Sequence, residues 1–533
     1  MTPRLELSLS RLIPYLFAGF VLSPGLGDAQ ELDPRQVLEE RCSGCHAARS
    51  GGGFERISDI RKTPEGWEMT IVRMGIWHDV EVPEDELALL VGYLADAQGL
   101  APSETTGQRF ILERQPNVVE DIPNEQANII CARCHSYARV ALQRRDEEEW
   151  RKLSHAHLGQ HPTTEYQSLG RDRDWWGIAR DKMPKVLSDI YPFRTDAWEA
   201  WRNSPKTDIS GTWRIRGDRP GVGRYTGTAE ITSSGRDQYE TTYSLHYSDG
   251  TEVPGESTSL VYTGYEWRGS AKLGDEEVRE VFALGESGNT LDGRWFLADA
   301  DEIGADFHAV RVRESETQIM SVEPPMLRAG TETALTVHGY GLKGNVNLGT
   351  GIKIIETVFS GTDRVKIIAL ADAAALPGSR TITVGGATID GGLTVFNQID
   401  SIRVEPPFGI SRVGGGTTPA VTAQFSAIAY LNGPDGKPGT NDDIRMGNVP
   451  AQWSIENFDE EAEEMKDRDF VGAIDQNGTF APAGAGPNPE RKYKTNNAGR
   501  VTVKALVSDG GQELEGSAEM VVTVQRWNSP PIL

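Results

Sequence analysis

The spacing of hydrophobic positions divides the chain into a short apolar run, a helical part and a β part. The apolar run is Leu12–Leu22, near the N-terminus. Up to about residue 205 the apolar residues recur at helical spacing, and beyond residue 206 they alternate in short segments separated by glycine-rich turns. We therefore expect helices first and antiparallel strands afterwards. The clearest helix-like stretches are 66–75, 87–97, 149–159 and 186–191.

The N-terminal apolar run has the features of an export signal. Arg4 and Arg11 precede it, and small residues end at Ala29, where cleavage is expected. The run is shorter than the roughly 20 residues that span a bilayer. Residues 1–29 are predicted to be a cleaved signal peptide, which gives a periplasmic mature chain without membrane insertion. An uncleaved membrane anchor is the alternative.

The β part is predicted to hold three domains. Repeated hairpin signals across 206–317 predict an antiparallel β-barrel. Val322-Glu323-Pro324-Pro325 and Val404-Glu405-Pro406-Pro407 then introduce two similar segments. Each motif is predicted to be an extended entry into a first strand, because proline lacks a donor for a strand ladder. The two segments, 318–397 and 398–533, are predicted to be immunoglobulin-like β-sandwiches.

Composition narrows the classes of partner. The 533 residues include 54 Lys and Arg against 78 Asp and Glu, a net charge of −24. This balance argues against binding to nucleic acid or to an anionic membrane surface, both of which require basic patches. Of the sequence motifs sought, we find no glycine-rich nucleotide loop, nucleophile elbow or zinc-protease motif.

The four cysteines form two identical motifs, Cys42-x-x-Cys45-His46 and Cys131-x-x-Cys134-His135. C-x-x-C-H is the attachment signature of haem c. Two thiols one helical turn apart form thioethers with the two vinyl groups, and the adjacent histidine binds the iron. We predict two covalently bound haem c groups and no disulfide. Residues 30–205 would form a helical dihaem cytochrome c domain, with units of about 30–115 and 116–205.

The sixth iron ligands are inferred from a repeated spacing. Trp67 precedes Met74 by seven residues, and Trp150 precedes His157 by seven. Seven residues are two helical turns, so each pair shares a helix face, and the repeat indicates an internal duplication. We predict His46 and Met74 as axial ligands of the first haem, and His135 and His157 of the second. The remaining candidates are Met69 and His78 for the first haem, and His155, His161 and Met183 for the second.

Two other features favour structural roles. The loop 432–443 has oxygen-bearing side chains among glycines but lacks EF-hand spacing, so a solvated hairpin is favoured over a calcium site. His338 lies in a strand-and-turn context and is expected to have a structural role.

Taken together, the two haem motifs, the Trp-x6-Met/His repeat and the three β domains resemble the α subunit of quinohaemoprotein amine dehydrogenase. The specific part of this resemblance is the order of domains, which extends over essentially the whole mature chain. It implies a periplasmic heterotrimer with a small subunit that carries cysteine tryptophylquinone and with a β-propeller subunit. Primary amines would be oxidised at that quinone to aldehyde and ammonia.

The resemblance also implies that electrons leave through the two haems to an external blue copper protein or cytochrome c. The catalytic residues would then lie outside this chain. Two alternatives are a free-standing dihaem electron carrier with β docking domains and a dihaem cytochrome c peroxidase. A peroxidase needs one haem without a sixth protein ligand.

Overall fold

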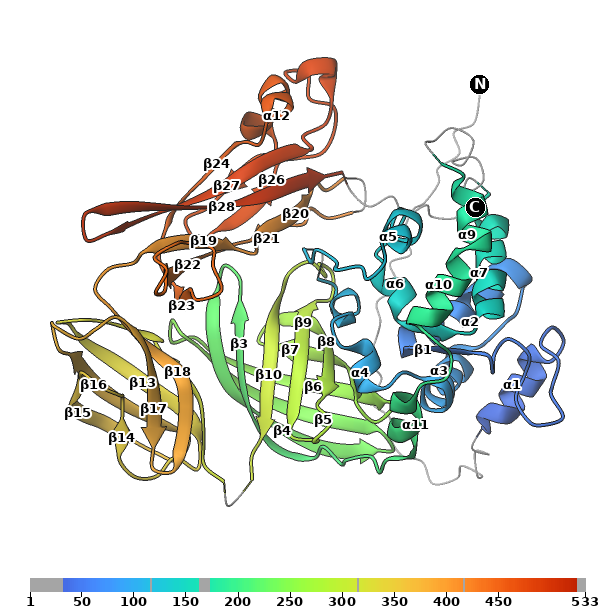
Figure 1. Cartoon of the computed structure of the whole chain (residues 1–533), viewed down its shortest axis with the longest axis horizontal. Helices are drawn as coiled ribbons and strands as arrows, with labels where there is room; N and C mark the ends of the chain where they lie inside the picture. The colour runs from blue at the N-terminus through green and yellow to red at the C-terminus, as the bar shows by residue number, and fades with distance from the viewer. Residues whose placement is uncertain (1–31, 116, 163–172, 314–315, 416–417, 525–533) are drawn as a thin grey trace, which may run out of the picture.

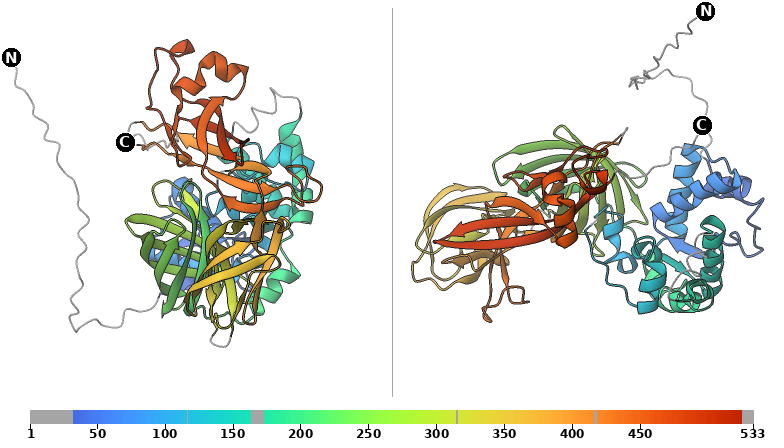
Figure 2. Two further views of the ribbon diagram at one scale, coloured as in Figure 1. Left: turned by 90° about the vertical axis from the view of Figure 1, so that its left-hand side faces the viewer. Right: turned by 90° about the horizontal axis from the view of Figure 1, so that it is seen from above.

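The chain folds into a helical N-terminal region, a closed β-barrel and two further β-sheet domains (Figure 1). The computed structural model describes residues 32–524, except 116, 163–172, 314–315 and 416–417. The predicted signal peptide, 1–29, lies outside these residues. Within this described part, no helix is long and apolar enough to cross a membrane. The view from above shows the helical region and the first of the two β-sheet domains on opposite sides of the barrel, with the last domain lying over the barrel (Figure 2).

The predicted helical character of the N-terminal region is confirmed. The side chains of Thr63 and Asp146 cap the two central helices, accepting from the backbone N–H of Gly66 and Glu149. The elements of the region are α1 (Pro34–Cys42), β1 (Ile60–Lys62), α2 (Pro64–His78), α3 (Glu84–Gln98), α4 (Pro102–Thr105), η1 (Arg109–Ile111), α5 (Glu125–Cys131), α6 (Ala138–Ala141), β2 (Gln143–Arg145), α7 (Glu147–Gln160), α9 (Trp175–Asp181), α10 (Met183–Ile190) and α11 (Asp196–Asn203).

A two-stranded antiparallel ribbon joins the two halves of this region. β1 pairs with β2, and Arg61 lies opposite Arg144. Arg61 is six residues before Trp67, and Arg144 is six residues before Trp150, so equivalent positions meet at the centre of the ribbon. Each strand leads directly into the helix that carries its tryptophan, α2 or α7. The ribbon therefore relates these two helices by a local pseudo-two-fold axis.

One carboxylate holds both arginines at that axis. Glu104, from α4, accepts from Arg61 at 2.8 and 2.9 Å and from Arg144 Nε at 3.1 Å. All three side chains are buried. Burial alone would raise the pKa of Glu104, but its bond to Arg61 and the charge of Arg144 keep the pKa below its usual value. Glu104 is therefore ionised and neutralises two buried cations at once.

The predicted antiparallel barrel is confirmed as a closed eight-stranded barrel in the order β10-β3-β4-β5-β6-β7-β8-β9. Its interior is filled by large side chains, including Trp213, Trp267 and Phe282. The strands are β3 (Gly211–Arg219), β4 (Gly223–Gly235), β5 (Gln238–Tyr247), β6 (Glu252–Tyr262), β7 (Glu266–Leu273), β8 (Glu276–Leu284), β9 (Thr290–Leu297) and β10 (Gly304–Arg311).

The helical region packs against the barrel through polar contacts of α2 and α3. Half-buried Arg268, on β7, bonds to Glu65 in the first turn of α2 and to Glu266 at 2.8 Å. Close by, the backbone N–H of Thr263 donates to Asp96 of α3 at 3.0 Å. These contacts fix α2 and α3 against the rim of the barrel. The position of the first half of the helical region is thus set by the barrel as well as by the ribbon.

Two β-sheet domains complete the chain. The first contains sheets β11-β13-β16-β15 and β12-β18-β17-β14, and the second contains β19-β22-β23, β20-β28-β27-β24 and β21-β26-β25. Their immunoglobulin-like classification stays a prediction. The strands of the first are β11 (Gln318–Glu323), β12 (Met326–Arg328), β13 (Glu332–Tyr340), β14 (Val346–Asn347), β15 (Ile352–Ser360), β16 (Arg364–Ala371), β17 (Gly378–Val384) and β18 (Ala387–Phe396).

The last domain also contains two short helices, α12 (Glu460–Met465) and α13 (Asp467–Phe470). The bounds of its other elements are β19 (Ser401–Glu405), β20 (Phe408–Arg412), β21 (Ala423–Gln424), β22 (Ser426–Leu431), β23 (Ile444–Asn448), β24 (Gln452–Asn457), β25 (Gly472–Ile474), β26 (Thr479–Pro482), η2 (Lys492–Lys494), β27 (Gly499–Asp509) and β28 (Gln512–Thr523).

The two Val-Glu-Pro-Pro motifs lie one strand later than expected. Val322 and Glu323 end β11, and a cis Glu323–Pro324 bond leads to β12 in the other sheet of the same domain. Val404 and Glu405 end β19 in the same way. The proline pairs therefore do not introduce a first strand but transfer the chain between two sheets. The reason is the same missing donor, which ends a ladder as readily as it suits an edge.

His338, for which a structural role is predicted, lies where the barrel contacts the domain that follows it. Its Nδ1 lies 3.3 Å from the Thr226 hydroxyl of the barrel. Burial lowers the pKa of His338 to about 4, and the charges of Arg364, His246 and Lys366 act in the same direction. The imidazole is therefore neutral in the folded chain at neutral pH.

Replacing Glu104 by Gln is expected to destabilise the protein strongly. Two buried guanidinium groups would lose their shared anion, a change that costs about 3–5 kcal/mol. We expect a lower melting temperature in calorimetry of the haem-loaded protein. Glu86→Gln is the matched control, because Glu86 pairs with Arg41 at the surface and such pairs contribute up to about 1 kcal/mol. Equal melting temperatures for the two variants would contradict this role of Glu104.

His338→Gln is expected to make stability less sensitive to acid. The unfolded imidazole takes up a proton near pH 6.5 and the folded one near pH 4, so stability due to neutral His338 is present above pH 6.5 and lost as the pH falls. The loss is at most about 3 kcal/mol. Calorimetry at pH 4.5 and 7 should show a smaller pH-dependent fall in melting temperature for the variant. An unchanged difference would contradict the prediction.

Candidate functional site

The first cysteine motif forms a turn at the end of α1. Cys42 is the last residue of the helix, and its carbonyl accepts from the N–H of Cys45 at 3.1 Å and of His46 at 2.9 Å. Cys42 is half-buried beside the apolar cluster around Trp67, whereas Cys45 is exposed. Burial raises the pKa of the Cys42 thiol. The two thiols are thus one turn apart, with Cys42 directed towards the apolar cluster and Cys45 towards solvent.

The imidazole of His46 is oriented by its own loop. Its Nδ1 lies 3.1 Å from the carbonyl oxygen of Glu55 and donates to it in the tautomer that this contact favours. Nε2 then carries a free lone pair. A metal-binding histidine commonly donates its other ring N–H to a carbonyl in this way, which fixes both tautomer and ring orientation.

The second motif repeats this arrangement at the end of α5. Cys131 is the last helical residue and is half-buried, whereas Cys134 is exposed. Burial raises the pKa of Cys131 to about 12. His135 Nδ1 lies 2.8 Å from the carbonyl oxygen of Ser136, and burial lowers its pKa, so the ring is neutral with Nε2 free. Neutral imidazole is the form that binds iron.

Met74 lies on the inner face of α2. Trp67 and Ile71, which precede it by seven and three residues, pack in the same apolar cluster as Cys42. A helix places residues at these spacings on one face, so Met74 continues the face that is directed towards the first cysteine motif. Its side chain is half-buried. The thioether is therefore available to a group seated beside Cys42.

His157 occupies the equivalent position on α7. Its Nδ1 lies 2.8 Å from the carbonyl oxygen of Leu153, one turn earlier on the same face as Trp150. Burial lowers the pKa of His157, and the nearby charge of His135 adds to this effect. The structure thus brings His135 and His157 close together, each with Nδ1 occupied by a carbonyl.

The other candidate ligands have different surroundings. Met183 is buried in the core of the second half, and Met69 lies towards solvent beside Arg139. His155 packs edge-on against the ring of Trp176 at 5.6 Å between centroids. The side chains of His78 and His161 are exposed.

The side chains at the two motifs are those that attach haem c, and α2 also has an exposed apolar face. The four thiols are free, and α2 exposes Val72, Ile76 and Trp77, with Ile76 69% exposed. So much exposed apolar area on one helix is unusual for a surface that water covers. Together with the free Nε2 atoms, this donor set suits haem at both motifs.

Sequence reasoning did not identify two arginines at this site. Arg73 is the neighbour of Met74 on α2, and Arg139 follows His135 by four residues. The Nη2 atom of Arg139 reaches 3.1 Å from the sulfur of Met69, so α6 and α2 meet there. Surface arginines are common, and nothing in the local sequence separates these two from the rest.

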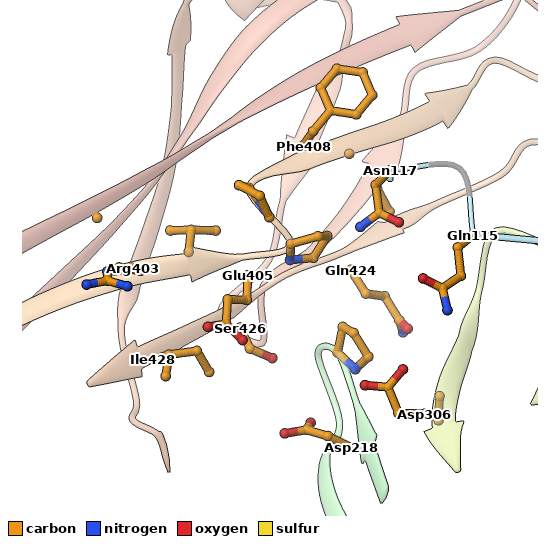
Figure 3. A pocket seen from close by; sticks show the side chains of 18 of the residues that line it. Gln115, Asn117, Asp218, Asp306, Arg403, Glu405, Phe408, Gln424, Ser426 and Ile428 are labelled. Carbon is orange, nitrogen blue, oxygen red and sulfur yellow. The ribbon is translucent and has the colours of Figure 1, made fainter. Parts of the chain in front are cut away.

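A cavity lies elsewhere, where Gln115 and Asn117, the barrel and the last domain meet (Figure 3). It has a volume of about 800 Å³. Asp218 and Glu405 line it beside Arg445, which lies 3.9 and 3.0 Å from their carboxylates. None of the cysteines or candidate iron ligands lines this cavity.

The loop 432–443 binds its own backbone. Asp442 accepts from the N–H of Asp435, and Asp443 accepts from the N–H of Gly439 and Thr440. Among the residues that the structure describes, no three His, Cys, Asp or Glu side chains are grouped so that they could hold a metal ion.

Four family models match the chain. They are described as the haem-binding domain of the quinohemoprotein amine dehydrogenase alpha subunit, over residues 33–198, and as domain II, domain III and domain IV of the same subunit, over 206–312, 316–397 and 402–532. Together they span most of the sequence in the order expected from the resemblance. No curated protein matches the chain.

Solved structures match only parts of the chain. A redesigned β-barrel, mFAP1, bound to DFHBI is 15% identical and covers 20% of this chain and 94% of its own, with a TM-score of 0.17. Mouse PcdhgC3 EC1-3 is 12% identical over 44% of this chain and 76% of its own, also with a TM-score of 0.17. SGBP-B of the Bacteroides ovatus mixed-linkage glucan utilization locus, in complex with a mixed-linkage heptasaccharide, is 10% identical and covers 62% of this chain and 72% of its own, with a TM-score of 0.19. Similarities this weak carry no argument about function.

Proposed function

The chain belongs to the family of quinohaemoprotein amine dehydrogenase alpha subunits, and from this membership we propose that it is the dihaem electron-transfer subunit of a periplasmic amine dehydrogenase. Haem c at each cysteine motif would supply a one-electron carrier, because its iron alternates between ferric and ferrous states. The residues of this chain attach the two groups, orient the iron ligands and set the two potentials.

Each haem would be held by residues from one half of the helical region. Cys42 and Cys45 form the thioethers of the first, with His46 and Met74 as axial ligands. The second is attached in the same way, through Cys131, Cys134, His135 and His157. The observation that carries this assignment is the free Nε2 of the three histidines, each held by an Nδ1 contact to a carbonyl at 2.8–3.1 Å.

The chemistry on the amine would take place on a partner subunit. In the proposed heterotrimer, a small subunit carries cysteine tryptophylquinone, which oxidises primary amines to aldehyde and ammonia, and a β-propeller is the third subunit. The donor delivers electrons singly to the two haems, which pass them to a blue copper protein or a cytochrome c. The family-model matches over the described helical and β domains support this division of labour.

Purification of the native protein tests this proposal. We expect two haems per chain that resist extraction with acidified acetone, a mature N-terminus at Gln30, and two partner subunits, the smallest containing a quinone. The haems should be reduced on addition of a primary amine. Isolation of a haem-loaded chain without partners would favour a free-standing carrier, and peroxide turnover by that chain alone would favour a peroxidase.

The axial ligands are tested by replacing them one at a time. Met74→Ala should abolish the long-wavelength absorption band of the ferric iron–thioether bond and lower one midpoint potential, because thioether ligation favours ferrous iron. His157→Ala should leave that band and alter the spectrum of the other haem. Met69→Ala, five residues earlier on α2, is the control and should change neither the band nor the spectrum of the other haem. Loss of the band in Met69→Ala instead would reassign the ligand.

A further inference from the structure

An excess of positive charge lies at the seam between the two haem units. Arg73 and Arg139 approach this seam from α2 and α6, and both side chains are half-buried. The sulfur of Met69 accepts from Arg139 at 3.1 Å, and the Arg73 guanidinium lies 5.6 Å from the centroid of the Trp77 ring. Among the described residues, no carboxylate lies within 4.0 Å of either guanidinium.

The two arginines meet on one face of α2. Arg139 contacts Met69, and Arg73 follows Met69 by four residues, which is one helical turn further along the same face. Two like charges that are partly withdrawn from water and share no anion are unfavourable. The contrast with the Glu104 site is direct, because there the chain places one carboxylate between two arginines.

A third cation extends the same region. Lys62, at the end of β1, is buried and donates to the Thr70 hydroxyl. Burial lowers its pKa well below the usual value, and the charges of Arg145, Arg73 and Arg56 act in the same direction. The described residues again place no carboxylate within 4.0 Å of this amine.

The second unit has an ion pair at the position where the first unit has Lys62 without a carboxylate partner in the described part of the chain. Lys62 and Arg145 both lie five residues before the repeated tryptophan. Arg145 has a carboxylate partner, Glu149, at 3.9 Å. The position equivalent to Glu149 is Gly66, where an added Cβ would meet the Lys62 Cβ at 2.9 Å. The first unit therefore has a cation, Lys62, at the position of Arg145 but no carboxylate at the position of Glu149.

The seam lies beside the ligands proposed for the second haem. Arg139 is four residues after His135. Its contact with Met69 places α6, which follows the second cysteine motif, against the helix that carries Arg73. Arg73 also adjoins Met74, the ligand proposed for the first haem. One helix therefore presents a ligand to one haem and a cation to the other.

We propose that Arg73 and Arg139 form a clamp for a propionate group of the haem attached at Cys131 and Cys134. This inference rests on the proposed function, since a propionate is present only if haem is bound. Propionate carboxylates are the anions that haem itself brings, and arginine binds carboxylates through two parallel N–H···O bonds.

The clamp would act on the redox potential. A positive charge close to haem favours the ferrous state, which has one positive charge fewer at the iron. Arg73 and Arg139 are positioning and tuning residues in this proposal, because they contact the edge of the group and not its iron. They also tie the second haem to the helix that serves the first.

Spectroelectrochemical titration of the haem-loaded protein tests the clamp. Arg73→Gln and Arg139→Gln should each shift the ferric–ferrous equilibrium constant of the His135/His157 haem about tenfold towards the ferric state, about 59 mV for one electron. The double variant should shift it by less than the sum, because both side chains hold one carboxylate. Arg73→Lys should leave the midpoint potential of this haem close to that of the unchanged protein, because the positive charge is kept.

Arg151→Gln is the matched control, because Arg151 is a surface cation on the helix that carries His157 and pairs with Glu147 and Glu148. It should leave both potentials unchanged. An unchanged potential in both clamp variants, or a shift equal to that of Arg151→Gln, would overturn the clamp. Haem content separates this failure from failure of the proposed function: two covalent haems with unmoved potentials refute only the clamp, whereas a chain without covalent haem refutes the function.

Discussion

The arrangement of the helical region depends on one buried carboxylate shared by two arginines. Glu104 lies at the centre of the β1–β2 ribbon, where it binds Arg61 and Arg144. Burying three charges is costly, and the cost is offset only when the geometry satisfies all of them. Because each strand runs straight into α2 or α7, the ribbon sets the angle between these helices. The distance between the two ligand sets follows from this single site.

The barrel adds a second fixed point, and of the two ligand helices it binds α2 directly. Arg268 binds Glu65 at the start of α2 and the buried Glu266 on its own strand. No equivalent contact to α7 is found among the described residues. The second unit contacts the barrel through α11 instead, where Trp201 Nε1 donates to the carbonyl oxygen of Thr263 at 2.9 Å. Any movement between the two ligand sets would have to strain the Glu104 site.

Much of this architecture could be predicted from the sequence, and the remainder could not for a physical reason. The spacings Trp67–Met74 and Trp150–His157 report local helix geometry, so the ligand helices were predictable. Short alternating segments likewise predicted the barrel. Glu104 is 43 residues from Arg61 and 40 from Arg144, and no local pattern encodes such a contact. The Val-Glu-Pro-Pro motifs were misplaced for a related reason, since proline ends a ladder as well as beginning one.

The two units share the residues that build their cores and the ribbon, and they differ at the proposed ligands and at the positions of Lys62 and Gly66. The tryptophans and the paired arginines are identical in both halves, and these side chains build the cores and the ribbon. In the proposed assignment the differences are Met74 against His157, and Lys62 with Gly66 against Arg145 with Glu149. A thioether raises the potential of its haem, and a second imidazole lowers that of the other. A cation on α2 that reaches the second haem would raise the lower of the two potentials and reduce the difference between them. Two carriers held at one fixed distance would then exchange electrons in either direction, so that the donor and the acceptor decide the flow.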